Sequence, residues 1–155
     1  MAPGPGRALL CLAAVSCATL LAARADAELG GDVRSVERDR ARMNAAVTSV
    51  HPMGRYTVHE MTAGSGATVR EFATSDGRIF AVAWRGPVHP DYQQLLGAYF
   101  PRLQQAARPR QARRAPVVID TPEFFFEVAG HVGDMAGRAY IPQMVPAGVG
   151  TEEIK

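Results

Sequence analysis

The sequence predicts an α+β domain in which an antiparallel sheet packs against helices. Residues 32–47 and 92–103 carry apolar side chains at helical spacing. Residues 55–84 contain three runs rich in β-branched and aromatic residues, separated by turns that contain glycine. A further alternating run covers residues 123–130. We therefore expect an N-terminal helix, an antiparallel β-meander, one packed amphipathic helix and a C-terminal strand that returns to the sheet.

The first helix is expected over residues 32–47, with Asp32 as its N-cap and no Gly or Pro inside. Its apolar positions are Val33, Val36, Met43 and Val47. Glu37 and Arg40 stand three residues apart and can pair on the solvated side. The pattern is typical of a charged amphipathic helix.

The meander is expected over residues 55–62, 67–74 and 78–84. Asp76 and Gly77 between the second and third runs indicate a hairpin, which we expect to be a type I′ turn. Phe72 and Trp84 are expected in or near the core.

The register of the first hairpin is left open by its pattern. Pairing across Gly64 and Ser65 places Glu60 and Glu71 on one face, but neither face is then fully apolar. Either both faces are partly covered, or the register differs by one residue, which would move every side chain to the opposite face.

The second helix is expected to begin after Asp91, which can cap it, and to pack on the sheet. Its apolar stripe consists of Tyr92, Leu95, Leu96, Tyr99, Phe100 and Leu103. Pro101 lies inside the pattern and removes a backbone donor, so we expect a kink or a break before it.

The last part of the chain begins with residues 106–116, which are rich in Arg and Pro and are expected to form a flexible loop. Ordered sequence resumes at residues 117–119. Residues 123–130 predict a fourth strand, and the glycine-rich residues 130–142 predict a turn into a short fifth strand.

The N-terminus predicts export. Residues 8–23 are uncharged and follow Arg7, and the string Ala25-Asp26-Ala27 is an A-x-A cleavage site. The apolar run is shorter than the roughly 20 residues that a bilayer needs. We expect residues 1–27 to be a signal peptide and residues 28–155 to be a single exported domain, periplasmic or secreted. A lipoprotein attached through Cys17 is a less favoured alternative.

Composition narrows the classes of function. The chain has 17 Lys and Arg against 15 Asp and Glu, a net charge of +2, which provides no global field for a polyanion. Its two cysteines, Cys11 and Cys17, lie in the signal, so the mature domain has neither a disulfide nor a cysteine nucleophile.

Metal and cofactor sites are not indicated. The histidines outside the signal show no metal-binding spacing; they are His51, His59, His89 and His131. A site assembled through space from His59, His131 and Asp134 is conceivable, but scattered histidines are ordinary, and we expect no metal and no cofactor.

Acid–base chemistry has three weak candidates, His59, Glu60 and Glu71. Two carboxylates across a pair of strands could act on a glycosidic bond. Strand positions paired with Arg70 or Arg78 explain the same residues without catalysis, and this interpretation is favoured.

A small-anion or protein-binding site has three weak candidates, His131, Asp134 and Arg138, which lie among glycines. The alternative is a tight turn in which glycines permit positive φ and Arg138 pairs with Asp134. The structural alternative is favoured.

One basic cluster stands out, made of Arg102, Arg108, Arg110, Arg113 and Arg114. Export and the lack of interleaved aromatic residues argue against nucleic acid. A solvated tether is the simplest interpretation, followed by contact with an anionic envelope surface.

Several motifs together resemble a family of exported proteobacterial proteins, the domain of unknown function number 2844. They are Ala27-Glu28-Leu29-Gly30-Gly31-Asp32, Tyr56-Thr57-Val58-His59-Glu60, Val69-Arg70-Glu71-Phe72, Phe80-Ala81-Val82-Ala83-Trp84-Arg85-Gly86-Pro87, Leu95-Leu96-Gly97-Ala98-Tyr99-Phe100 and Gly137-Arg138-Ala139-Tyr140-Ile141-Pro142. The resemblance covers essentially the whole mature chain and implies no activity, cofactor or catalytic residue.

The sequence thus favours a non-enzymatic exported envelope protein that acts as a binding or assembly module for another exported or surface protein. The alternative is a cell-envelope hydrolase that uses carboxylate and histidine acid–base chemistry.

Overall fold

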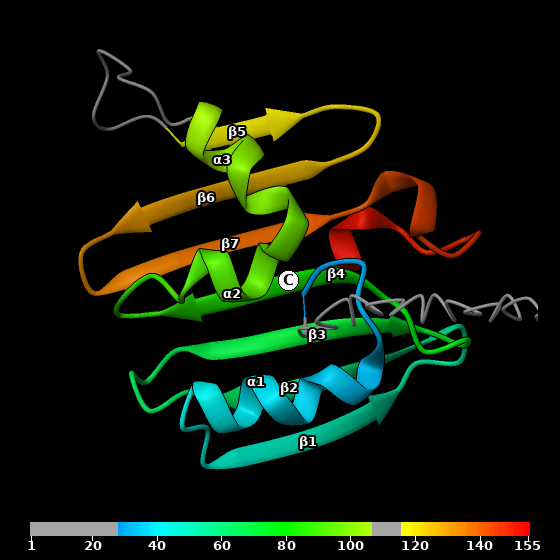
Figure 1. The fold of residues 1–155 in the computed structure, drawn as a ribbon, viewed down its shortest axis with the longest axis horizontal. Coiled ribbons are helices and arrows are strands. Elements are labelled where there is room, and N and C mark those ends of the chain that lie inside the picture. The colour runs from blue at the N-terminus through cyan, green and yellow to red at the C-terminus, as the bar shows by residue number, and fades with distance from the viewer. Residues whose placement is uncertain (1–27, 107–115) are drawn as a thin grey trace, which may run out of the picture.

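The computed structural model describes residues 28–106 and 116–155. Their chain forms one seven-stranded antiparallel sheet with helices packed against it, in the strand order β1-β2-β3-β4-β7-β6-β5 (Figure 1). The predicted α+β class is confirmed. The predicted signal peptide, and most of the predicted Arg- and Pro-rich loop, lie outside the described residues.

The sheet is built from two meanders that meet at its centre. The strands are β1 (Val47–Pro52), β2 (Tyr56–Thr62), β3 (Thr68–Thr74), β4 (Ile79–Gly86), β5 (Val117–Asp120), β6 (Phe125–His131) and β7 (Asp134–Tyr140). Strand β7 pairs with β4, which inserts the last strand beside the first meander and confirms the predicted return of the chain to the sheet.

The first helix is shorter than predicted. A 3₁₀ turn, η1 (Val33–Ser35), leads into α1 (Val36–Arg42), and Asn44 then adopts a φ of 49°. A left-handed residue cannot continue a right-handed helix. Val47, which was expected inside the helix, instead begins β1, a strand that the sequence interpretation missed.

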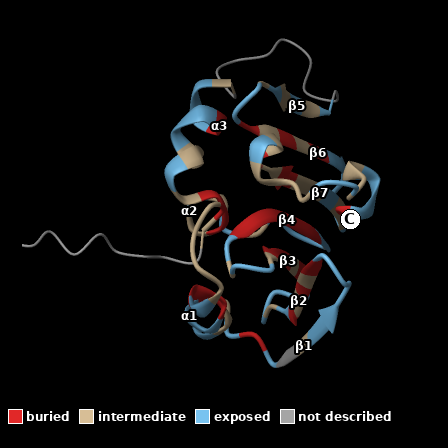
Figure 2. Cartoon of the chain, turned by 90° about the vertical axis from the view of Figure 1, so that its right-hand side faces the viewer, coloured by how far each residue is buried: buried red, intermediate tan, exposed pale blue. Residues whose placement is uncertain are grey.

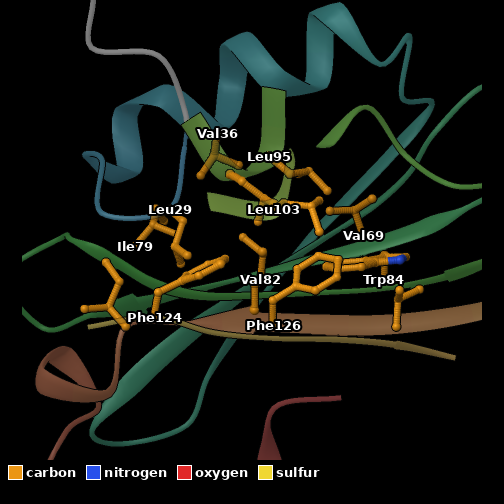
Figure 3. Packing of buried hydrophobic residues seen from close by; sticks show 14 of the residues in the cluster. Leu29, Val36, Val69, Ile79, Val82, Trp84, Leu95, Leu103, Phe124 and Phe126 are labelled. Carbon is orange, nitrogen blue, oxygen red and sulfur yellow. The ribbon is translucent and has the colours of Figure 1, made fainter. Parts of the chain in front are cut away.

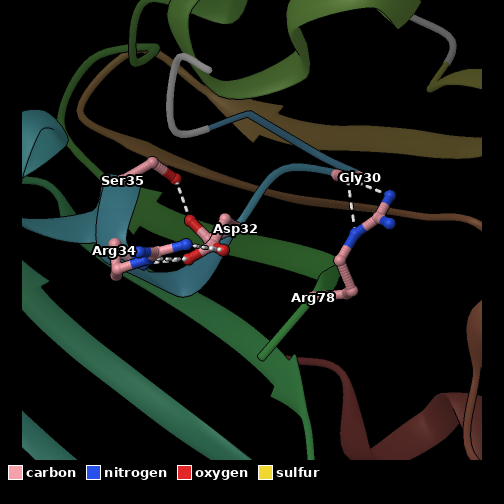
Figure 4. Close-up of polar contacts among 5 residues, drawn as sticks. All are labelled: Gly30, Asp32, Arg34, Ser35 and Arg78. Carbon is pink, nitrogen blue, oxygen red and sulfur yellow. Dashed lines mark hydrogen bonds and ion pairs between the residues drawn. The ribbon is translucent and has the colours of Figure 1, made fainter. Parts of the chain in front are cut away.

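The start of α1 is tied to the β3–β4 turn (Figure 4). Asp32 accepts hydrogen bonds from the backbone N–H and the side chain of Arg34, which lower its pKa to about 2. The Arg78 side chain donates to the Gly30 carbonyl, and Val33 N–H donates to the Gly77 carbonyl over 2.8 Å. The segment is therefore positioned before α1 begins.

The second helical segment is broken at a glycine. It consists of α2 (Tyr92–Leu96), η2 (Gly97–Tyr99) and α3 (Phe100–Ala106). Asp91 caps α2 as predicted, accepting from the N–H groups of Gln93 and Gln94. Gly97 has a φ of 49°, so the break comes there, and Pro101 lies in the first turn of α3. Backbone N–H groups in the first turn of a helix make no intrahelical hydrogen bond, so a proline there removes none.

The register of the first hairpin differs by one residue from the pairing across Gly64 and Ser65. His59 lies opposite Glu71, and Glu60 lies opposite Arg70. The second of the two open alternatives is therefore correct. The β3–β4 turn is not type I′, because Gly77 has a φ of 81° while Asp76 does not have a positive φ. Its Gly77 N–H donates to the Thr74 carbonyl, as in a three-residue loop.

The helices cover one face of the sheet, here called the helix face (Figure 2). The larger part of the core lies there, between the helices and the strands; its labelled members in Figure 3 are Leu29, Val36, Val69, Ile79, Val82, Trp84, Leu95, Leu103, Phe124 and Phe126. Trp84 is 3% exposed, as the sequence predicted. Gly137 lies directly beneath its indole, where a Cβ would collide with the ring.

The opposite face, here called the tail face, is partly covered by residues 142–155, which include η3 (Pro142–Met144) and η4 (Thr151–Glu153). Ile154 is completely buried in a second core cluster. It packs there with Tyr56, Val58, Phe72, Phe80, Ala81 and Ala83. Phe72 is 2% exposed, so its predicted burial is also confirmed.

Candidate functional site

The predicted acid–base residues do not form one site. His59 and Glu71 lie opposite each other on the helix face, whereas Glu60 lies on the tail face. There the Glu60 carboxylate accepts a hydrogen bond from Arg70 Nε over 2.5 Å. The expectation that Glu60 and Glu71 share one face is therefore wrong, because the register is shifted by one residue.

Glu71 is buried in a carboxyl pair. Its side chain is 2% exposed, and Asp39 of α1, which is fully buried, lies against it. Burial raises the pKa of Glu71 well above its ordinary value, and the neighbouring Asp39 raises it further. Gln94 Nε2 of α2 donates to Asp39 Oδ1 over 2.7 Å. The sequence interpretation missed Asp39 and Gln94, because their meeting depends on how α1 and α2 pack.

His59 is half-buried on the strand beside Glu71, and burial lowers the pKa of its imidazole. Two hollows, one beside the C-terminal segment and one beside α2, are not lined by His59, Asp39 or Glu71. This group can hold a proton inside the protein, and it lies outside both of these hollows.

The predicted binding residues around the glycine turn are also separated. His131 is exposed at the tip of the β6–β7 hairpin, and Asp134 next to it forms an ion pair with Arg85 over 3.1 Å. Arg138 lies further along β7 and donates from Nε to Glu127 over 2.9 Å. The expected pairing of Arg138 with Asp134 is therefore wrong.

Arg138 belongs instead to a row of charges that crosses the tail face. The register aligns five residues on five neighbouring strands, in the order Glu60, Arg70, Ala83, Arg138 and Glu127. Arg70 lies between Glu60 and Ala83, and Arg138 lies between Ala83 and Glu127. The small Ala83 leaves space over β4 between the two guanidinium groups, and Ile154 occupies it.

The two arginines of this row hold the C-terminal segment in place. Arg70 Nη1 donates to the Lys155 carbonyl over 2.8 Å, and Arg138 Nη1 donates to the Thr151 carbonyl over 2.6 Å. The Arg138 guanidinium also lies 5.5 Å from the centre of the Phe125 ring. Residues 151–155 therefore run across β7, β4 and β3 and form a wall on the tail face.

A groove of about 940 Å³ lies beside this wall, over β3 to β7. Its lining includes the exposed Ala129 and Ala136, and also Ala83, which is buried beside Ile154. The cationic side chains that line it are Arg70, Arg85, Arg138 and Lys155, and the acidic ones are Glu127 and Glu152. Arg85 is the most open of the paired arginines here, with 72% of its side chain exposed.

The groove can bind an elongated ligand that carries anionic or carbonyl groups. Guanidinium groups bind such oxygens directionally, and Arg70 and Arg138 already bind carbonyl oxygens of the tail. Of the groove's charged residues, sequence reasoning identified only Arg138 as a binding candidate. Arg70 joins Arg138 only because β7 inserts beside β4, and neither that insertion nor the wall formed by residues 151–155 has a signal in the sequence.

The predicted basic cluster is described only at Arg102. This residue forms an ion pair with Glu123 over 3.3 Å and lies over the Tyr99 ring. Its other members, Arg108, Arg110, Arg113 and Arg114, lie outside the described residues, so contact with an anionic surface stays a prediction.

No group of three or more His, Cys, Asp and Glu side chains in residues 28–106 and 116–155 is arranged to hold a metal ion. In the same ranges, no helix has the length and hydropathy to cross a membrane.

Fold and groove together define a small α+β domain with one helix-covered face and one face that carries a partly walled groove. The family model described as "Protein of unknown function (DUF2844)" matches residues 25–154, and the chain belongs to this family. The family resemblance seen in the sequence is confirmed. No curated protein and no solved structure matches the chain.

Proposed function

We propose that this protein is a non-enzymatic, exported envelope protein and that it works as a binding module through the groove on its tail face. The observation that carries the proposal is the groove itself, which combines a floor of alanines with fixed guanidinium groups. Export rests on the signal-peptide pattern of residues 1–27.

The groove favours an elongated ligand over a small compact one. Its lining comes from five strands, and its charged groups stand at intervals on different strands. A chain that bears carboxylate or phosphate groups could approach Arg85 and Lys155 while its apolar parts lie on Ala129 and Ala136. An acidic peptide or an acidic glycan of the envelope has this chemistry.

The hydrolase alternative loses the geometry that motivated it. Its candidate residues lie on both faces of the sheet, and Glu71 is buried away from the groove. Glu127 and Glu152 line the groove, but Glu127 is engaged with Arg138. Binding is therefore the function that the arrangement of these side chains supports best.

The proposal is tested by filling the groove. Ala136→Phe places a large side chain at an exposed floor position, and Ala98→Phe makes the same change at an exposed position outside the lining of the groove. Each tagged mature domain is incubated with solubilised envelope extract and, separately, with an acidic glycan such as alginate or an acidic peptide such as poly-glutamate.

We expect the wild type and A98F to retain the same envelope component and A136F to lose it. Binding to alginate or poly-glutamate should weaken in Arg85→Ala and with added salt, because exposed charge pairs are screened. Equal retention by all variants, or retention of nothing by the wild type, would contradict the proposed groove. Circular dichroism checks that A136F is folded.

A further inference from the structure

The outer edge of β1 is an unprotected strand edge. In the described part of the chain β1 is the last strand of its side of the sheet, and its six residues include no Asp, Glu, Lys or Arg. Natural edge strands are usually shortened or charged, which prevents pairing with other chains. The other edge follows this rule, since β5 has four residues and ends in Asp120.

The hydrogen-bond pattern shows which backbone groups of β1 point outward. Met53 N–H donates to the Tyr56 carbonyl over 2.8 Å, which marks these two residues as a hydrogen-bonded pair at the end of the β1–β2 ladder. In an antiparallel ladder, such pairs alternate along the strand. Ser49 and His51 therefore face β2 with their backbone groups, and those of Thr48, Val50 and Pro52 face away from the sheet.

This alternation explains why a proline is tolerated in β1. Pro52 has no N–H, and at an outward-facing position the sheet loses no hydrogen bond of its own. The outer edge thus presents N–H groups only at Thr48 and Val50, and carbonyl groups at Thr48, Val50 and Pro52.

We propose that β1 pairs with β1 of a second copy of this chain, antiparallel and about a two-fold axis at Val50. The two Val50 residues then exchange both of their outward hydrogen bonds. The N–H of each Thr48 donates to the carbonyl of the partner's Pro52. Because Pro52 itself has no N–H, every outward N–H group of the strand then has an acceptor. The edge is complementary to itself in this register, which is what an isologous contact requires.

The side chains of this strand suit the same contact. Val50 is 53% exposed, and the two-fold axis brings it against its own counterpart, so apolar surface on both copies is buried. On the tail face, Ser49 of one copy lies opposite His51 of the other, two polar residues that already share a 3.0 Å contact within one chain. No like charges oppose each other along the strand.

The helices do not obstruct the pairing. Asp39 of α1 packs against Glu71 of β3, so α1 lies inward of β1. Neighbouring strands are about 4.8 Å apart, so the β2 strands of the two copies would be about 14 Å apart, and the β3 strands, which α1 contacts, would be farther apart still. Packed helices need only about 8–10 Å between their axes.

Paired in this way, the two sheets become one continuous sheet. A two-fold axis perpendicular to the sheet keeps both tail faces on the same side, so the two grooves would point in one direction. The inference is independent of the proposed function, because β1 does not line the groove.

The association is tested by analytical ultracentrifugation of the mature domain from about 1 µM to about 1 mM, the range in which a small interface dissociates. We expect a monomer–dimer equilibrium for the wild type. Val50→Pro removes the outward N–H and should weaken the dimer at least tenfold. Val118→Pro is the matched control, because Val118 faces outward on β5, where Thr121 N–H donates to Phe124 O, and this variant should dimerise normally.

Charge exchange tests the position of the two-fold axis. Val50→Lys and Val50→Glu should each be monomeric, because two like charges would lie opposite each other, and an equimolar mixture should form a heterodimer. Circular dichroism and thermal melting confirm that each variant is folded. A wild type that is monomeric up to about 1 mM, a dimer that V50P leaves unchanged, or a mixture that does not associate would overturn the proposal.

Discussion

The most unusual residue is Glu71, a carboxylic acid kept in the core beside a second one. Its oxygens accept no hydrogen bond from any donor in the described residues, although they are buried. Ionisation of such a group is opposed by the loss of water and by the nearby Asp39. The folded protein therefore holds a proton on Glu71 more tightly than the unfolded chain does.

This protonation makes stability depend on pH. Because the folded pKa of Glu71 lies above the unfolded one, its contribution is fully present below the unfolded pKa and is lost as pH rises towards the folded pKa. In that window the free energy of unfolding should fall by about 1.4 kcal/mol per pH unit from this group. Glu71→Gln keeps the shape of the side chain without the acid, so it should remove this slope and stabilise the protein at alkaline pH.

Urea unfolding at a series of pH values above the ordinary carboxyl pKa measures the effect, as the difference between the wild type and E71Q at each pH. His59 adds an opposite slope in the acid range, because its lowered pKa makes stability rise with pH there, but this slope is common to both proteins and cancels in the difference. Glu60→Gln is the matched control, because Glu60 is the neighbouring carboxylate on the other face and pairs with Arg70. A wild-type stability that is flat with pH, or a slope that persists in E71Q, would contradict the assignment.

At the scale of elements, the C-terminal segment covers the tail face of the sheet, as the helices cover the helix face. Helices cover the helix face, whereas the tail face is covered by 3₁₀ turns and one buried isoleucine. Ile154 fills the space above Phe72 and Phe80, and the arginines of β3 and β7 fix the backbone on either side of it. The groove depends on this segment because it supplies one wall.

Ile154→Ala should therefore destabilise the domain and loosen the groove wall. Removal of a fully buried isoleucine side chain costs about 2–5 kcal/mol. Val132→Ala is the control, because Val132 is 98% exposed at a hairpin tip and should change the free energy of unfolding very little. Chemical denaturation gives both values, and an I154A variant as stable as V132A would show that the tail does not belong to the core.

The elements also show where sequence patterns were sufficient. Alternation and turn residues located β2, β3, β4 and β6, and Asp91 marked the start of α2, because these signals are local. Strand β1 was missed because Val47 also fits the helical spacing that begins at Val33. The left-handed Asn44 lies among residues 43–46, which separate the two elements.

The candidate site was less predictable than the fold. A one-residue error of register exchanges the faces of a strand, so Glu60 and Glu71 were grouped although they lie on opposite sides. Arg70 and Arg138 acquire their common role only when β7 inserts beside β4, through contacts between residues far apart in the sequence. No local pattern encodes that insertion.

At the scale of the whole molecule, export gives the proposed function its setting. If residues 1–27 are a signal peptide, protein recovered from the envelope or the medium should begin at Glu28, and intact mass with N-terminal sequencing measures this directly. Ala27→Lys should block cleavage, because the site requires small residues, while Glu28→Gln leaves them unchanged. A lipid-modified Cys17 at the N-terminus, or an uncleaved chain inside the cell, would contradict the predicted signal peptide.

The sequence by itself determined the α+β class, the order of most elements, the family and the absence of cysteine from the domain after residue 27. The class and the order of the elements follow from local periodicity, and the lack of cysteine follows from composition. The family follows from the resemblance of several motifs to a known family. Tertiary structure alone decided the register, the burial of Glu71 against Asp39, and the groove between the tail and the alanine floor. Each of these depends on which distant segments meet, and that is set by the packing of the whole chain rather than by any short stretch of it.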